Sequence, residues 1–76
     1  MEEIKSLDLV ALLADLPEQG LRRGAVGTVL EQLKANGLHP AGWIVEFVSF
    51  DGKDYVEADI TDAARMMKLN FQRLAA

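Results

Sequence analysis

The chain has 76 residues, of which 50% are hydrophobic, and carries a net charge of −4 at pH 7 with one histidine and no cysteine. This length predicts a single domain, 1–76, and the lack of cysteine excludes disulfides and thiolate metal sites. The acidic balance argues against nucleic acid as a partner. The start Met1-Glu2-Glu3 has no apolar signal region, and no apolar run is long enough to cross a membrane, so we expect a cytoplasmic protein without membrane contact.

The high apolar fraction favours association with another chain. A domain of this size buries only about 60% of the surface that its unfolded chain exposes. Surplus apolar surface is commonly covered by a second copy or by a partner protein. We therefore expect a homo-oligomer or a complex with a partner protein.

The first half of the chain predicts two strands separated by a loop. Asp8–Leu13 is predicted as a strand from the topology, although its leucines and alanine also allow a helix. A loop follows over Pro17–Gly24, because proline stops the preceding element. Val26–Leu33 is the second strand, and Gly27 inside it predicts a bulge or a sharp bend that helps a small sheet to curl.

The clearest element is a hairpin of strands Trp43–Phe50 and Asp54–Ile60, which follows a turn-rich connection over Asn36–Gly42. The hairpin is joined by Asp51-Gly52, a dipeptide typical of a two-residue type I′ turn. This turn sets the register, which places Glu46 opposite Glu57. One face of the hairpin then carries only core-type residues: Trp43, Val45, Phe47, Val56, Ala58 and Ile60.

The C-terminal part has two interpretations. A short helical turn over Thr61–Ala64, capped by Thr61, followed by a strand over Arg65–Asn70 would complete a five-stranded barrel. A continuous helix from Asp62 to about Leu74 also fits, because its apolar residues recur at helical spacing.

Four motifs stand out along the chain: Leu9–Leu13, Leu16–Val29, Val45-Glu46-Phe47 and Asp51-Gly52-Lys53. They are similar to a family of small bacterial proteins catalogued as domain of unknown function 4926, and the predicted elements resemble an SH3-like barrel. The resemblance covers about Leu7 to Leu69 and departs from the family between Lys34 and Gly42, where the loop looks longer. It implies a mainly β fold, a small five-stranded SH3-like partly open barrel with a short helical turn before the last strand. It implies no established activity and no catalytic residues.

Charged residues are expected on the outer face of the hairpin: Glu46, Glu57 and Asp59. Like charges directly opposite each other are destabilising. We therefore expect Arg22 or Arg23, a basic group of a second subunit or a cation to offset them. A solvated face neither excludes water nor shifts pKa values strongly, so a charged surface or interface is favoured over a weak cation site or acid–base chemistry.

The remaining candidates for chemistry have ordinary structural interpretations. His39, before Pro40 in a turn, lacks neighbouring metal ligands and is expected to be a solvated loop residue. Ser6 and Ser49 lack the surroundings of a catalytic nucleophile. One of Met66 and Met67 is expected to fill the core. We predict no catalytic residue, no metal and no cofactor.

The outer face of the hairpin also carries four apolar residues: Ile44, Val48, Phe50 and Tyr55. We predict that they lie in an interface, together with the outer face of the first strand. We therefore predict a non-enzymatic interaction module that self-associates or binds a partner protein. The alternative is a small-molecule-binding or enzymatic protein with a site between subunits. That site would use Glu46, Glu57, Tyr55 and Arg22.

Overall fold

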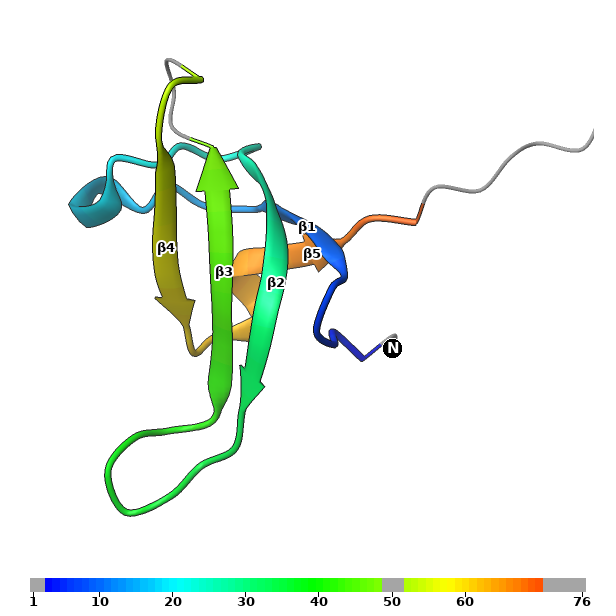
Figure 1. The fold of residues 1–76 in the computed structure, drawn as a ribbon, viewed down its shortest axis with the longest axis vertical. Helices are drawn as coiled ribbons and strands as arrows, with labels where there is room; N and C mark the ends of the chain where they lie inside the picture. Colours follow the sequence, from blue (N-terminus) through cyan, green and yellow to red (C-terminus); the bar gives the residue numbers. More distant parts are fainter. Residues whose placement is uncertain (1–2, 49–51, 71–76) are drawn as a thin grey trace, which may run out of the picture.

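The computed structural model describes residues 3–48 and 52–70. Within them five antiparallel strands form one sheet in the order β4-β3-β2-β1-β5, with β4 and β5 at its two edges. In Figure 1, β1 and β5 run across the direction of β2, β3 and β4 and lie behind them. The prediction of a mainly β fold with five strands in a partly open sheet is confirmed. The strands are β1 Leu9–Leu12, β2 Val26–Leu33, β3 Gly42–Val48, β4 Tyr55–Ile60 and β5 Met66–Lys68.

The predicted strands lie in the right places, but the first, fourth and fifth extend too far. The ends predicted at Asp8, Leu13 and Asp54 fall outside β1 and β4. The last strand has three residues instead of the six of Arg65–Asn70. Residues 49–51 lie outside the described residues, and the predicted type I′ turn falls partly on them.

The register of the hairpin is confirmed along its whole described length. Trp43 pairs with Ile60, Glu46 with Glu57, and Val48 with Tyr55. Because side chains alternate between the two faces of a strand, this register directs one set inward. The predicted core face is accordingly buried or half-buried throughout the hairpin.

The end of the described chain is a turn and a strand, so the continuous helix considered from Asp62 is wrong as far as Asn70. A 3₁₀ turn, η2, spans Ala63–Arg65 and leads directly into β5. Its cap is Asp62, whose carboxylate accepts the Ala64 N–H at 2.9 Å, and not Thr61 as expected. The pairing of β5 with β1 outweighs the helical spacing, because it places Met66 in the core opposite Leu12.

The core extends beyond the sheet into the first loop. Two leucines of this loop, Leu16 and Leu21, exchange backbone hydrogen bonds of 2.9 and 3.1 Å and are both buried. A 3₁₀ turn, η1 over Pro17–Gln19, brings them together and ends at Gly20 with φ of 71°. The core residues are Ile4, Val10, Leu12, Leu16, Leu21, Val29, Val45, Phe47, Ala58, Ile60 and Met66.

Gly27 makes room for an aromatic ring. It lies between Val10 and Phe47 in the sheet. A Cβ atom built on Gly27 would lie 2.7 Å from Cδ1 of Phe47 and 2.8 Å from the Glu46 carbonyl oxygen. The bulge expected at this glycine occurs instead between Val29 and Glu31, so that part of the prediction is wrong. The ring of its cross-strand neighbour Phe47 thus requires a glycine at this position, and the spacing of residues in the sequence does not reveal that contact.

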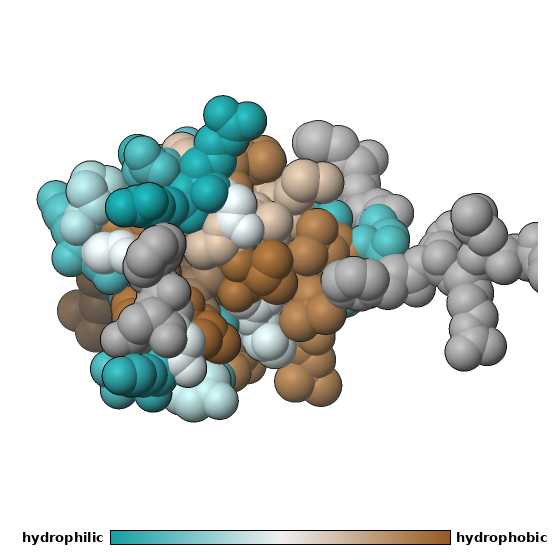
Figure 2. Space-filling model, turned by 90° about the horizontal axis from the view of Figure 1, so that it is seen from above, coloured by the Kyte–Doolittle hydropathy of each residue, from teal (hydrophilic) through white to brown (hydrophobic). Residues whose placement is uncertain are grey.

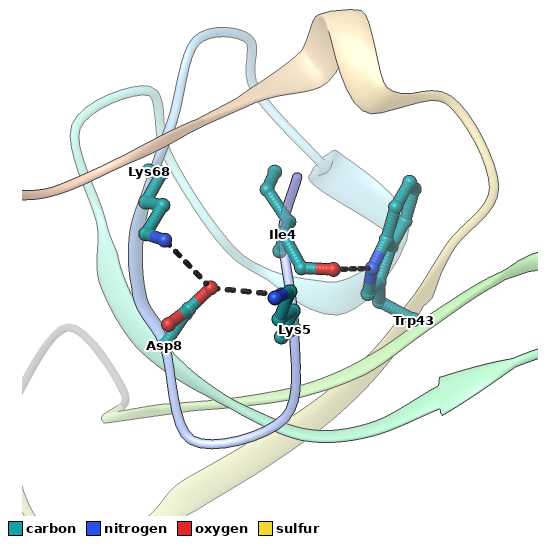
Figure 3. A network of polar contacts seen from close by, with 5 residues as sticks. All are labelled: Ile4, Lys5, Asp8, Trp43 and Lys68. Atoms are coloured by element: carbon teal, nitrogen blue, oxygen red, sulfur yellow. Dashed lines mark hydrogen bonds and ion pairs between the residues drawn. The ribbon is translucent and has the colours of Figure 1, made fainter. Parts of the chain in front are cut away.

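The segment before β1 is fixed by polar contacts to two other parts of the sheet (Figure 3). The Trp43 indole N–H donates to the Ile4 carbonyl at 2.9 Å. The Asp8 carboxylate accepts the Lys5 N–H at 2.8 Å, and Lys68 Nζ lies 3.4 Å from the same oxygen. The Lys5 hydrogen bond, with a smaller contribution from Lys68, lowers the pKa of Asp8 below its usual range although desolvation opposes this.

We expect Gly27→Ala to lower the free energy of unfolding by about 1–3 kcal/mol, because the added methyl group would press on the Phe47 ring and the backbone of β3. Gly37→Ala is the control, because a Cβ there meets no atom within 4 Å. The measurement is urea unfolding followed by tryptophan fluorescence. Equal stability of the two variants would contradict the close packing at Gly27.

We expect Asp8→Asn to destabilise the protein near neutral pH and to lose this effect in acid. The pKa of Asp8 is lower in the folded state, so its stabilisation is present above the unfolded pKa of about 3.9 and disappears as pH falls through the folded pKa. Urea unfolding from about pH 7 to about pH 2 measures the difference from the parent chain. Glu18→Gln, in the exposed η1 turn, is the control. A penalty of Asp8→Asn that does not change with pH would refute the assignment.

Candidate interaction surface

The outer face of the sheet carries a row of apolar side chains. Residues directly opposite in antiparallel strands share a face, so the strand register defines this surface row by row. Tyr55 pairs with Val48 at one side of the sheet. At the other side Val26 pairs with Ala11, which pairs with Met67.

The two parts of the row meet between β2 and β3. Gly27 pairs with Phe47, so continuing the antiparallel register by one residue sets Val26 beside Val48. One row therefore crosses all five strands. We call Tyr55, Val48, Val26, Ala11 and Met67 the outer apolar row.

Four of the five side chains in the outer apolar row are largely accessible. Tyr55 is 72% exposed, and Val26, Val48 and Met67 are each about half exposed. Figure 2 looks onto the end of the sheet where β3 ends and β4 begins, and it shows hydrophobic surface gathered there beside hydrophilic residues. Single exposed apolar residues are ordinary, whereas a contiguous group of this kind is typical of an interface.

Acidic residues occupy the next rows of the same face. Glu46 and Glu57 are directly opposite each other, as predicted, and Asp59 lies opposite Ile44 one row further on. Glu31 follows on β2, opposite Ile44. Within the described part of the chain, Glu46 and Glu57 form no ion pair with a basic side chain. Compensation of the two negative charges by Arg22 or Arg23 remains a prediction.

The two arginines line a groove at the opposite side of the outer apolar row. The groove has a volume of about 270 Å³ and is lined by Gly20, Leu21, Arg22, Arg23, Ala25 and Val48. Asp15 accepts the Arg23 backbone N–H at 2.7 Å, which holds this part of the loop. Gly24 contributes a φ of 92°, a conformation that L side chains rarely adopt. Val48 belongs both to the groove and to the outer apolar row.

The structure brings together only some of the residues that the sequence suggested as an interface. Val48 and Tyr55 are exposed neighbours. Ile44 is half-buried and lies between Glu31 and Asp59, away from the row. Phe50 lies outside the described residues.

Sequence reasoning missed Val26 and left open which of Met66 and Met67 faces outward. The alternation of side chains along β2 and β5 could have indicated both outward residues. Gly27 and Met66 face the core, so their neighbours Val26 and Met67 face outward. Met66 is buried while Met67 is 48% exposed, so the expectation that one methionine fills the core is confirmed.

His39 lies in the β2–β3 connection, as expected, where its side chain is partly exposed. Asn36 organises its turn, because the Asn36 Oδ1 atom accepts the N–H groups of Leu38 and His39 at 2.6 and 3.0 Å. The Asn36 Nδ2 atom also lies 3.0 Å from Nε2 of His39. The histidine is thus part of the β2–β3 connection.

Residues 3–48 and 52–70 contain no group of three or more histidine, cysteine, aspartate or glutamate side chains that could hold a metal ion. None of the helical segments in this part of the chain has the length and apolar character needed to cross a membrane.

We expect Glu57→Gln to leave the free energy of unfolding unchanged or to raise it by about 0.2–1 kcal/mol, because it removes a like charge opposite Glu46. Glu18→Gln, away from the sheet, serves as the control. Chemical unfolding of both variants at low protein concentration measures the effect. Strong destabilisation by Glu57→Gln would show instead that Glu57 belongs to a satisfied network.

Comparison with known proteins identifies a family without assigning an activity. No curated protein matches the chain, and no solved structure matches it either. A family model described as a domain of unknown function, DUF4926, matches residues 6–64. This match begins just before β1 and ends within η2, so it includes four of the five strands. The chain belongs to the DUF4926 family.

Proposed function

We propose that this protein is a non-enzymatic interaction module that binds a protein chain through the outer apolar row. The observation that carries this proposal is the continuity of the row across all five strands, with four of its side chains about half exposed or more. The strand order, with a 3₁₀ turn before β5, also suits the SH3-like barrel that the sequence resembles. Because such barrels host many functions, the surface carries more weight than the fold.

Burial of the outer apolar row supplies the driving force for binding. Apolar surface removed from water contributes about 25 cal/mol per Å². Tyrosine is a frequent source of binding energy in protein contacts, because its large ring loses little conformational entropy. Tyr55 is the most exposed member of the row, and its neighbour Val48 extends the apolar contact. The row therefore offers both an aromatic anchor and a surrounding apolar area.

A small-molecule site between subunits has weaker support. The groove beside Arg22 has a volume of about 270 Å³, just below the roughly 300–1,000 Å³ of typical ligand pockets. Glu46 and Glu57 lie on the outer face of the sheet and do not line this groove. The acids and the arginine of that alternative thus do not converge on one cavity.

Photo-crosslinking in cells tests the interaction. We expect benzoylphenylalanine at position 55 to give one defined protein adduct, because this side chain would lie in the contact. The control places the same group at position 38, where Leu38 is 95% exposed in the β2–β3 connection. Mass spectrometry identifies the adduct, and Val48→Lys in the same chain should abolish it. Equal adducts at both positions, or none at position 55, would refute the proposal.

A further inference from the structure

We propose that the occupant of the outer apolar row is a second copy of this chain, related by a two-fold axis that sets Arg23 of each copy against Glu57 of the other. This inference rests on the proposed function and names its partner. It starts from the order of three kinds of surface along the strands.

The surface changes from acidic to apolar to basic along the direction of β3 and β4. Glu46 precedes Val48 by two residues on β3, and Glu57 follows Tyr55 by two residues on β4. Side chains two apart on a strand share a face, so the acids adjoin the outer apolar row on one side. The groove with Arg23 adjoins the row on the other side, because Val48 lines it.

A two-fold axis that runs along the outer apolar row, in the plane of the contact, makes this order complementary to itself. In an isologous contact residue i of one copy meets residue j of the other, and the reverse pair forms as well. Turning one copy by half a turn lays its basic side over the acidic side of its partner. The apolar rows then meet in the middle, and two equivalent charge pairs form at the rims.

Charge complementarity favours a second copy over a basic partner protein. A surface of one sign would select a partner of the opposite sign. Here the acids and Arg23 lie on opposite sides of the same apolar row, so the chain supplies both halves of the match. Arg23 is exposed, and its backbone is held by Asp15 at 2.7 Å, which limits the directions in which the loop can point.

The two parts of this surface have different roles. Exposed ion pairs contribute little affinity, so burial of the apolar row drives association. The charges favour this two-fold arrangement over a half-turn about an axis parallel to the strands, because that half-turn would bring acids against acids. This division predicts that the charged residues can be exchanged as a pair, whereas the apolar row cannot be made polar.

Light scattering and sedimentation equilibrium measure the association. We expect the parent chain at about 50 μM, above the micromolar range of weak interfaces, to have twice the 8.4 kDa of one chain. Arg23→Glu and Glu57→Arg should each weaken the dimer about tenfold, because each change affects two symmetric pairs. The double variant Arg23→Glu/Glu57→Arg should restore the parent affinity to within about threefold. Thermal melting checks that each variant is folded.

Lys34→Glu is the matched control, because Lys34 is an exposed cation just beyond the opposite end of β2 and should not affect the dimer. A parent mass of one chain would overturn the second-copy proposal, while a crosslinked adduct with a different protein would leave the proposed function standing. A dimer that resists both single reversals, or that the double variant does not restore, would overturn the two-fold pairing. Dissociation of that dimer by Val48→Lys would still support the apolar row as the contact.

Discussion

The packing of the Phe47 ring against the backbone of Gly27 is the constraint on which the rest of the structure depends. Phe47 is the largest fully buried side chain of the core. Because Gly27 has no side chain, β2 and β3 can pair closely while the ring lies over the strand. Gly27 also pairs with Val10 of β1. Gly27 thus lies where β1 and β3 flank β2, and its lack of a side chain leaves space there for the Phe47 ring.

This arrangement also determines what reaches the surface. With Gly27 and Phe47 directed inward, their neighbours Val26 and Val48 must face outward, where they lie side by side. Neither side chain belongs to the core, and each is about half exposed. The proposed binding through the outer apolar row would account for the apolar character of these outward positions.

The hairpin could be predicted from the sequence because its signals are local. Asp51-Gly52 marks the turn, and strict alternation on both sides sets Val45 opposite Ala58 without any knowledge of the other strands. The bulge between Val29 and Glu31 could not be predicted, because it depends on where β3 pairs. The outer apolar row could be predicted only in part, because only some of its residues are neighbours within one hairpin. Val48 and Tyr55 are hairpin neighbours, whereas Val26 joins them only through the pairing of β2 with β3.

Contacts made by irregular segments were the hardest to foresee. Leu16 and Leu21 flank a predicted loop, and their burial requires the η1 turn that returns the chain on itself. The hydrogen bond from the Trp43 indole to the Ile4 carbonyl joins residues 39 positions apart, and no periodicity in the sequence indicates it. These contacts follow from the three-dimensional course of the chain.

The edge strand β4 has a consequence for the growth of the sheet. An edge strand presents unpaired backbone groups that could act as a template for further strands. Glu57 and Asp59 stand on this strand, and both are exposed. An identical strand that paired antiparallel with Glu57 opposite Glu57 or Asp59 would bring carboxylates together, and like charges directly opposite each other are destabilising. The acidic side chains of β4 thus oppose extension of the sheet by the same strand of another copy.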